Sequence, residues 1–105
     1  LTPEPAATPA AIEVIPIDGA AEAEAFRVTE ALREAGVAAE IGFSGAMRKR
    51  MTRADKRGAP LAILVGGDEG ARGVVLLRDL RAGDQREAPI AEVVEEARAV
   101  LASQA

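Results

Sequence analysis

The sequence of 105 residues contains no cysteine and no histidine, and its only aromatic residues are two phenylalanines. The lack of cysteine excludes disulfides and thiolate nucleophiles, and the lack of both residue types excludes the common zinc sites. Without histidine, the chain also lacks the side chain that most often acts as a general base near neutral pH. Aromatic platforms for stacking single-stranded bases are missing as well. If the chain recognises nucleic-acid bases at all, it must do so with arginine, carboxylate and backbone groups.

Long hydrophobic runs are also absent, and the N-terminus lacks the charged-then-apolar pattern of a signal peptide. We therefore expect a cytoplasmic protein with no membrane partner. Hydrophobic residues make up 49% of the chain, which favours a folded core over disorder. The length suits one domain, and the scarcity of aromatics means that alanine, valine, isoleucine and leucine must build its core.

The first eleven residues differ in composition from the rest. Pro3, Pro5 and Pro9 lie among alanine and threonine, a composition typical of an extended, solvated segment. We interpret residues 1–11 as an interdomain linker, although a simple terminal extension has the same composition. Residues 12–105 are then the folded domain.

Hydrophobic periodicity in the folded region predicts five strands and three helices. The predicted strands are 12–17, 37–43, 61–65, 74–77 and 85–88, and the predicted helices are 21–35, 46–58 and 89–101. Helices connect the first three strands, so we expect these to be parallel with right-handed crossovers. The fourth strand follows the third too closely for a parallel crossover and should be antiparallel to it. The predicted fold is an α/β domain with a mixed five-stranded sheet of order 2-1-3-4-5.

The predicted helix Ala46–Gly58 carries a marked local charge. It holds six cations and one acid, Asp55, a net charge of +5 within a chain of net charge −4. Such a run is either a solvated helix face or a site for RNA phosphates, and the pattern leaves both open. The predicted strand order puts the loops 18–19, 43–45 and 66–70 at a topological switch point, where open α/β sheets bind ligands.

Catalytic patterns are scarce in the sequence. Asp18, Asp68 and Glu69 could converge at the strand ends as a magnesium site or carboxylate pair, but such residues are more often turn formers. No Gly-Lys-Ser/Thr follows Gly66, so there is no phosphate-binding loop, and the first strand is not followed by a dinucleotide fingerprint. We therefore predict no catalytic residue and no metal site in this chain.

The segment with the local charge is also the one that carries a family resemblance. Residues 46–59 read AMRKRMTRADKRGA, and this resembles a stretch that histidyl-tRNA synthetases write roughly as SLKKQMKxADKxGA. The family's Gly-x-Asp-Glu turn is matched by residues 66–69. Its pattern GxVxxKDL…GxQ is similar to residues 73–80 and 83–85. The likeness covers about residues 12–101 and points to the C-terminal anticodon-binding domain of this class II synthetase family.

The resemblance implies an anticodon-binding-domain-like fold, a mixed five-stranded sheet with three helices, and a set of RNA contacts. Related synthetases read anticodon bases at three places, which correspond here to Ser44, Glu69 and Arg78. Arg78 stands where the histidine enzymes often have lysine, so the charge is kept. We expect phosphate contacts from the start of the basic segment. The predicted RNA-binding residues are Ser44, Gly45, Arg48, Lys49, Arg53, Glu69 and Arg78.

For the whole protein, the resemblance implies an ATP-dependent histidine–tRNA ligase. Its catalytic domain, outside this chain, would use ATP and magnesium, while this domain needs no cofactor. The expected partners are the anticodon loop of tRNA and the parent catalytic domain. We expect the domain alone to be a monomer and the parent a homodimer. The alternative is a regulatory or protein-interaction domain of a synthetase-like paralogue, because a fold does not determine a function.

Overall fold

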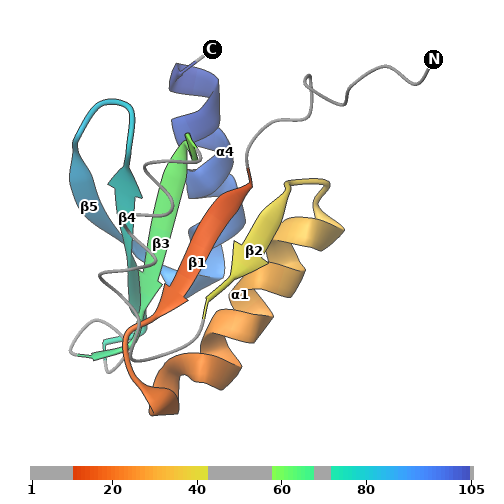
Figure 1. Ribbon diagram of the computed structural model, residues 1–105, viewed down its shortest axis with the longest axis vertical. Coiled ribbons are helices and arrows are strands. Elements are labelled where there is room, and N and C mark those ends of the chain that lie inside the picture. The colour runs from red at the N-terminus through yellow and green to blue at the C-terminus, as the bar shows by residue number, and fades with distance from the viewer. Residues whose placement is uncertain (1–10, 43–57, 68–71, 105) are drawn as a thin grey trace.

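The computed structural model describes residues 11–42, 58–67 and 72–104. These residues form one five-stranded sheet with two α-helices packed against it (Figure 1). The strands are β1 (Ile12–Pro16), β2 (Ala39–Ile41), β3 (Leu61–Val65), β4 (Val74–Asp79) and β5 (Gln85–Pro89). The helices are α1 (Glu22–Glu34) and α4 (Val93–Ser103), preceded by the short 3-10 helices η2 (Gly19–Ala21) and η3 (Ile90–Glu92).

The strand order across the sheet is β2-β1-β3-β4-β5, which confirms the predicted order and the mixed sheet. β1 pairs in parallel with β2 on one side and with β3 on the other. The β3–β4 and β4–β5 pairs are antiparallel. The apolar strands β1 and β3 thus each have a neighbouring strand on both sides. Side chains on both of their faces are buried, as is typical of interior strands.

The predicted number of helices is wrong. The part of the chain that the structure describes has two α-helices rather than three, α1 and α4. The predicted helix 46–58 lies outside the described residues, apart from Gly58, which is in a turn. The predicted linker 1–11 also lies outside them, apart from Ala11.

Several element bounds also differ from the prediction, and two of the differences have a clear cause. Pro89, predicted to begin the last helix, is extended (φ −60°, ψ 140°) and ends β5, and α4 begins only at Val93. Proline is tolerated there because β5 is an edge strand and Pro89 needs no ladder hydrogen bond. Of the predicted strand 37–43, the structure describes residues 37–42, and within them the strand covers only Ala39–Ile41. As an edge strand with a single neighbour, β2 is paired only where it faces β1.

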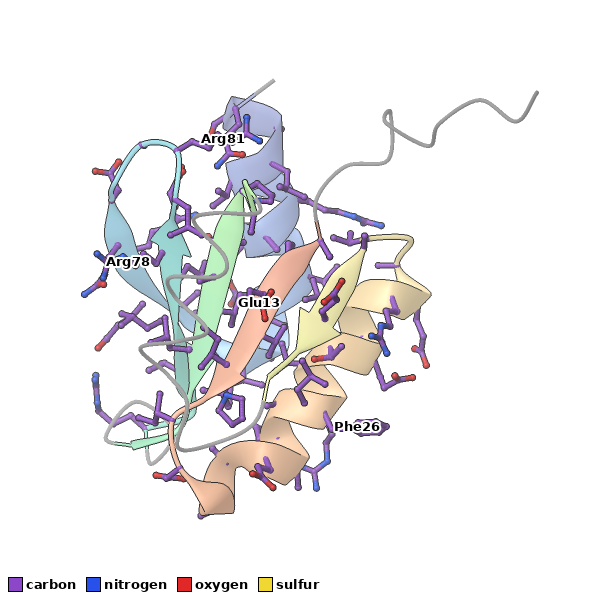
Figure 2. All side chains as sticks on the ribbon, viewed as in Figure 1. Glu13, Phe26, Arg78 and Arg81 are labelled. Carbon is purple, nitrogen blue, oxygen red and sulfur yellow. The ribbon has the colours of Figure 1, made fainter. Side chains whose placement is uncertain are left out.

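The core lies between the two helices and one face of the sheet. Its residues alternate along the strands, for example Ile12 and Val14 in β1 and Val75 and Leu77 in β4. The core is aliphatic, as expected, and Phe26 on α1 is 56% exposed and points away from it (Figure 2). Neither helix in the described part has the length and apolar stretch that a membrane crossing requires.

Candidate nucleic-acid interface

The sheet has a second face, which points away from α1 and α4. Because side chains alternate along each strand, the neighbours of core residues point to this second face. The strand register places one residue from each strand in a single row across it. In strand order the row is Glu40, Glu13, Ala62, Arg78 and Gln85. Glu13 is fully buried, whereas Arg78 and Gln85 are exposed.

Arg78 lies on β4 next to the hairpin that leads to β5. Its register partner on β5 is Gln85, and the Nη1 atom of Arg78 donates a hydrogen bond of 3.4 Å to the Oε1 atom of Gln85. The two neighbours of Arg78 along β4, Leu77 and Asp79, point to the helix side of the sheet. The guanidinium of Arg78 is therefore displayed on the second face, near the edge of the sheet (Figure 2).

The backbone hydrogen bonds show which β4–β5 pairs bring their side chains closest. The N–H of Asp79 donates to the carbonyl of Asp84 at 2.8 Å, and at the other end the N–H of Ile90 donates to Gly73 at 3.0 Å. Arg78 and Gln85 are therefore a non-hydrogen-bonded pair, the type in which opposing Cα atoms lie nearer, about 4.5 Å apart. The ladder itself holds these two side chains together.

A second polar pair on this face joins the turn before β4 to β5. The guanidinium of Arg72 donates two hydrogen bonds to the carboxylate of Glu87, from Nη1 to Oε1 at 3.1 Å and from Nη2 to Oε2 at 2.6 Å. Hydrogen bonding from Arg72 lowers the pKa of the Glu87 carboxyl below its usual value. The pair is exposed, so its effect is to orient the turn rather than to add much stability.

Of the predicted RNA-binding residues, the structure describes Arg78, which it places on the second face. The predicted residues outside the described part are Ser44, Gly45, Arg48, Lys49, Arg53 and Glu69. Their positions relative to Arg78 remain sequence predictions. The pairing of Arg78 with Gln85 was missed, although Gln85 belongs to the GxQ pattern, because sequence spacing alone does not give the register of a hairpin.

The predicted switch point is marked by a cavity. A hollow of about 340 Å³ lies where β1 and β3 end, and its lining includes Asp18, Glu24 and Gly66. Asp18 caps η2, since its Oδ1 atom accepts from the N–H of Ala21 at 2.9 Å. The other two acids of the suggested cluster, Asp68 and Glu69, lie outside the described residues. Within residues 11–42, 58–67 and 72–104, no group of three potential metal ligands comes together.

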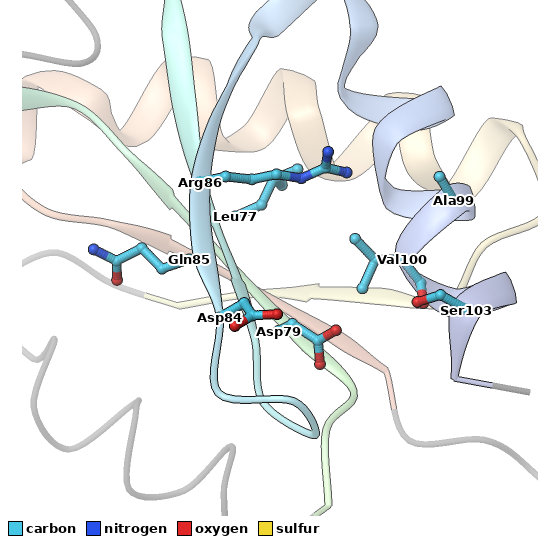
Figure 3. A pocket seen from close by; sticks show the side chains of 8 residues that line it. All are labelled: Leu77, Asp79, Asp84, Gln85, Arg86, Ala99, Val100 and Ser103. Atoms are coloured by element: carbon cyan, nitrogen blue, oxygen red, sulfur yellow. The ribbon is translucent and has the colours of Figure 1, made fainter.

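A second cavity, of about 310 Å³, lies between the β4–β5 hairpin and the end of α4 (Figure 3). Asp79 forms part of its wall, and the Oδ1 atom of Asp79 already accepts from the N–H groups of Arg81 and Ala82 and from Nε2 of Gln104. These hydrogen bonds, led by that from Ala82, lower the pKa of the Asp79 carboxyl. Asp79 therefore holds the hairpin and the C-terminal end of α4 together.

The matches to known proteins agree with this architecture. The family described as "Anticodon binding domain" matches residues 12–99 of the chain. The histidine–tRNA ligase of Gluconobacter oxydans is 42% identical over 85 residues, which are 81% of this chain and 20% of that protein. The histidine–tRNA ligase of Caulobacter vibrioides is 49% identical over 74 residues, 69% of this chain and 15% of that protein.

A solved structure shares the fold as well. The crystal structure of histidyl-tRNA synthetase from Nostoc sp. PCC 7120 has a TM-score of 0.81 and 30% sequence identity, and the match covers 90% of this chain and 23% of that chain. The chain thus spans about a fifth of the length of the proteins it matches. These matches show that the chain belongs to the anticodon-binding domain family, in the form that histidyl-tRNA synthetases carry.

Proposed function

We propose that this domain binds the anticodon loop of a tRNA and positions that tRNA for charging with histidine. The catalytic domain, which would use ATP and magnesium, lies outside this chain, and the parent acts as a homodimer in the cytoplasm. Membership of the anticodon-binding domain family and the likeness to histidine–tRNA ligases support the proposal. The observation that carries it is the exposed guanidinium of Arg78, on the sheet face that points away from both helices.

The chemistry of this face suits the bases of an RNA loop. Loop bases are unstacked and offer their edges to hydrogen bonding, and a guanidinium donates to base oxygens and ring nitrogens. In this proposal Arg78 and Glu69 contact bases, while Arg48, Lys49 and Arg53 contact phosphates and fix the position of the RNA. The domain supplies affinity and specificity, and it takes no part in bond making.

Replacing Arg78 with alanine in the full-length parent tests the proposal. We expect the variant to charge its cognate tRNA less efficiently and to discriminate less well against tRNAs with altered anticodons. By analogy with DNA readout, each lost base contact should reduce the free energy of discrimination by about 1–3 kcal/mol. Histidine-dependent ATP–pyrophosphate exchange, which needs no tRNA, should stay intact. Steady-state charging of tRNAs with substituted anticodons measures the effect.

Arg27→Ala is the matched control, because Arg27 is an exposed arginine on α1, away from the second face. It should leave charging unchanged. Glu69→Gln should impair discrimination in the same way as Arg78→Ala. If both the Arg78 and the Glu69 variants discriminate between anticodons like the wild type, the regulatory or protein-interaction role replaces this proposal.

A further inference from the structure

We propose that Gln85 is a second base-reading residue, and that Arg78 and Gln85 together recognise one nucleobase of the anticodon loop through the oxygen at C6 of guanine or at C4 of uracil. This inference rests on the proposed function and adds a specificity to it. The two side chains form a unit because they are opposed in the β4–β5 register, as a non-hydrogen-bonded pair on the second face.

The hydrogen bond between the two side chains determines which way the Gln85 amide points. An arginine side chain can only donate, so the carboxamide oxygen of Gln85 must face Arg78 and its NH2 group must face away. The 3.4 Å contact from Nη1 of Arg78 to Oε1 of Gln85 agrees with this orientation. In the part of the chain that the structure describes, the Nε2 atom of Gln85 donates no hydrogen bond, and neither do the Nε and Nη2 atoms of Arg78.

The pair therefore presents donors to solvent. Figure 3 shows Gln85 on the opposite side of β5 from Arg86 and Val100, so its amide does not point toward α4. Arg86, on the other side of the strand, forms an ion pair of 2.6 Å with Glu96. Gln85 and Arg78 thus remain together on the second face, with their donors available to a ligand.

The N–H groups that the pair turns to solvent discriminate between bases by the group that a base places at C6 of a purine or C4 of a pyrimidine. Guanine presents O6 and N7 as acceptors, and uracil presents O4. Adenine and cytosine carry amino groups at the corresponding positions, and an amino group placed against these donors leaves both without a partner. The Arg78–Gln85 pair should therefore prefer guanine or uracil over adenine or cytosine at one position of the loop.

The charge of Arg78 also makes the Arg78–Gln85 pair a better candidate for binding a base than the Arg72–Glu87 pair on the same face. Arg72 is held by two hydrogen bonds to the carboxylate of Glu87, which neutralises its charge. The described side chain that accepts a hydrogen bond from Arg78 is the neutral amide of Gln85, which orients the guanidinium without cancelling its charge. A charged donor makes stronger hydrogen bonds to an acceptor than a neutral donor does.

The experiment measures binding of the chain to stem-loop RNAs by fluorescence anisotropy. Each loop position is varied between a carbonyl base and its amino counterpart, uracil against cytosine and guanine against adenine. We expect wild-type protein to bind the carbonyl form about tenfold or more tightly at one position. Gln85→Met keeps the length of the side chain but removes the amide, and it should lose most of this ratio at that same position.

Further measurements make the test specific. Arg78→Ala should reduce the ratio at the same position as Gln85→Met, and the double variant should lose little more, because the residues act as a unit. Ala23→Met, which adds the same exposed side chain on α1, should keep the full ratio. Circular dichroism melts of each variant check that the fold is retained.

The outcomes separate this inference from the proposed function. If Gln85→Met keeps the wild-type ratio at every position while Arg78→Ala loses it, the role of Gln85 is refuted and the proposed function stands. If wild-type protein binds the RNAs without preferring a carbonyl base anywhere, the inference is also refuted. If wild-type protein binds no stem-loop at all, both proposals fail.

Discussion

Asp79 shows how a single carboxylate can hold several elements together. Its Oδ1 atom accepts hydrogen bonds of 2.9 Å from the N–H groups of Arg81 and Ala82, and of 2.8 Å from Nε2 of Gln104. The same amide nitrogen of Gln104 lies 3.0 Å from the carbonyl of Pro60, just before β3. One side chain thus links the β4–β5 hairpin to the end of α4.

Asp79→Asn should destabilise the domain by about 1 kcal/mol at neutral pH, because neutral hydrogen bonds replace charge-assisted ones. Urea unfolding measures the difference. Asp84→Asn is the control, since in the described residues the Asp84 side chain accepts no hydrogen bond. Equal effects of the two substitutions would contradict the role given to Asp79.

The same carboxylate predicts a dependence on pH. Hydrogen bonds from Ala82, Arg81 and Gln104 lower the folded-state pKa of Asp79 below its ordinary value of 3.8, so the unfolded chain binds this proton more tightly. The stabilisation is complete above the ordinary value and is lost as the pH falls through the folded-state value. The stability gap between wild type and Asp79→Asn should therefore close as the pH drops below about 4. A gap that stays constant down to acid pH would contradict this assignment.

The end of β3 and the start of α1 meet at a contact that only glycine permits. Gly66 has φ +117°, and a Cβ atom there would lie 2.6 Å from the Cβ atom of Ala21. Asp18 fixes the other side of this contact by capping η2. The approach brings together the loops that follow β1 and β3, and the cavity at the switch point lies beside it.

Gly66→Ala should therefore destabilise the domain more than an alanine at a glycine with open surroundings. Gly83→Ala is the matched control, because Gly83 has φ +82° and nothing lies within 4 Å of its added Cβ atom. The control substitution should lower the free energy of unfolding by about 1–2 kcal/mol, because alanine is disfavoured in a left-handed backbone conformation. Gly66→Ala should cost more, because a steric clash is added to the backbone strain. Thermal or urea unfolding compares them, and similar losses would argue against the close approach.

The net negative charge of the whole chain opposes the binding of RNA, which is also negatively charged. A chain of net charge −4 would repel RNA unless its cations are concentrated locally. Six of the 13 cationic residues lie in residues 46–58. Of this segment, the structure describes only Gly58. Binding should therefore depend on this segment for affinity and on the second face for specificity.

Replacing Arg48 and Lys49 together with alanine should weaken binding to every anticodon loop by a similar factor. Phosphate contacts release counterions, so each lost contact should flatten the salt dependence by about 0.7 in log–log slope for single-stranded RNA. Titrations at several salt concentrations measure it. An unchanged slope in the double variant would remove both residues from the interface.

Local patterns in the sequence were enough to predict the strand order and the aliphatic core. Apolar runs such as Leu61–Val65 mark strands buried on both faces, and the short loop between β3 and β4 forces an antiparallel pair. Each of these features depends on neighbouring residues or on the length of a connection. For that reason they can be inferred without coordinates.

Other features depend on contacts between segments that are distant in the sequence. Pro89 suits the end of an edge strand as well as the first turn of a helix, and its pairing opposite Val74 settles the choice. The row that joins Arg78 to Gln85 likewise exists only because the hairpin register opposes them. A shift of one residue in the register would turn either side chain to the other face of the sheet. No local sequence pattern encodes this register. The tertiary structure therefore decides which side chains form the surface that we propose binds the RNA.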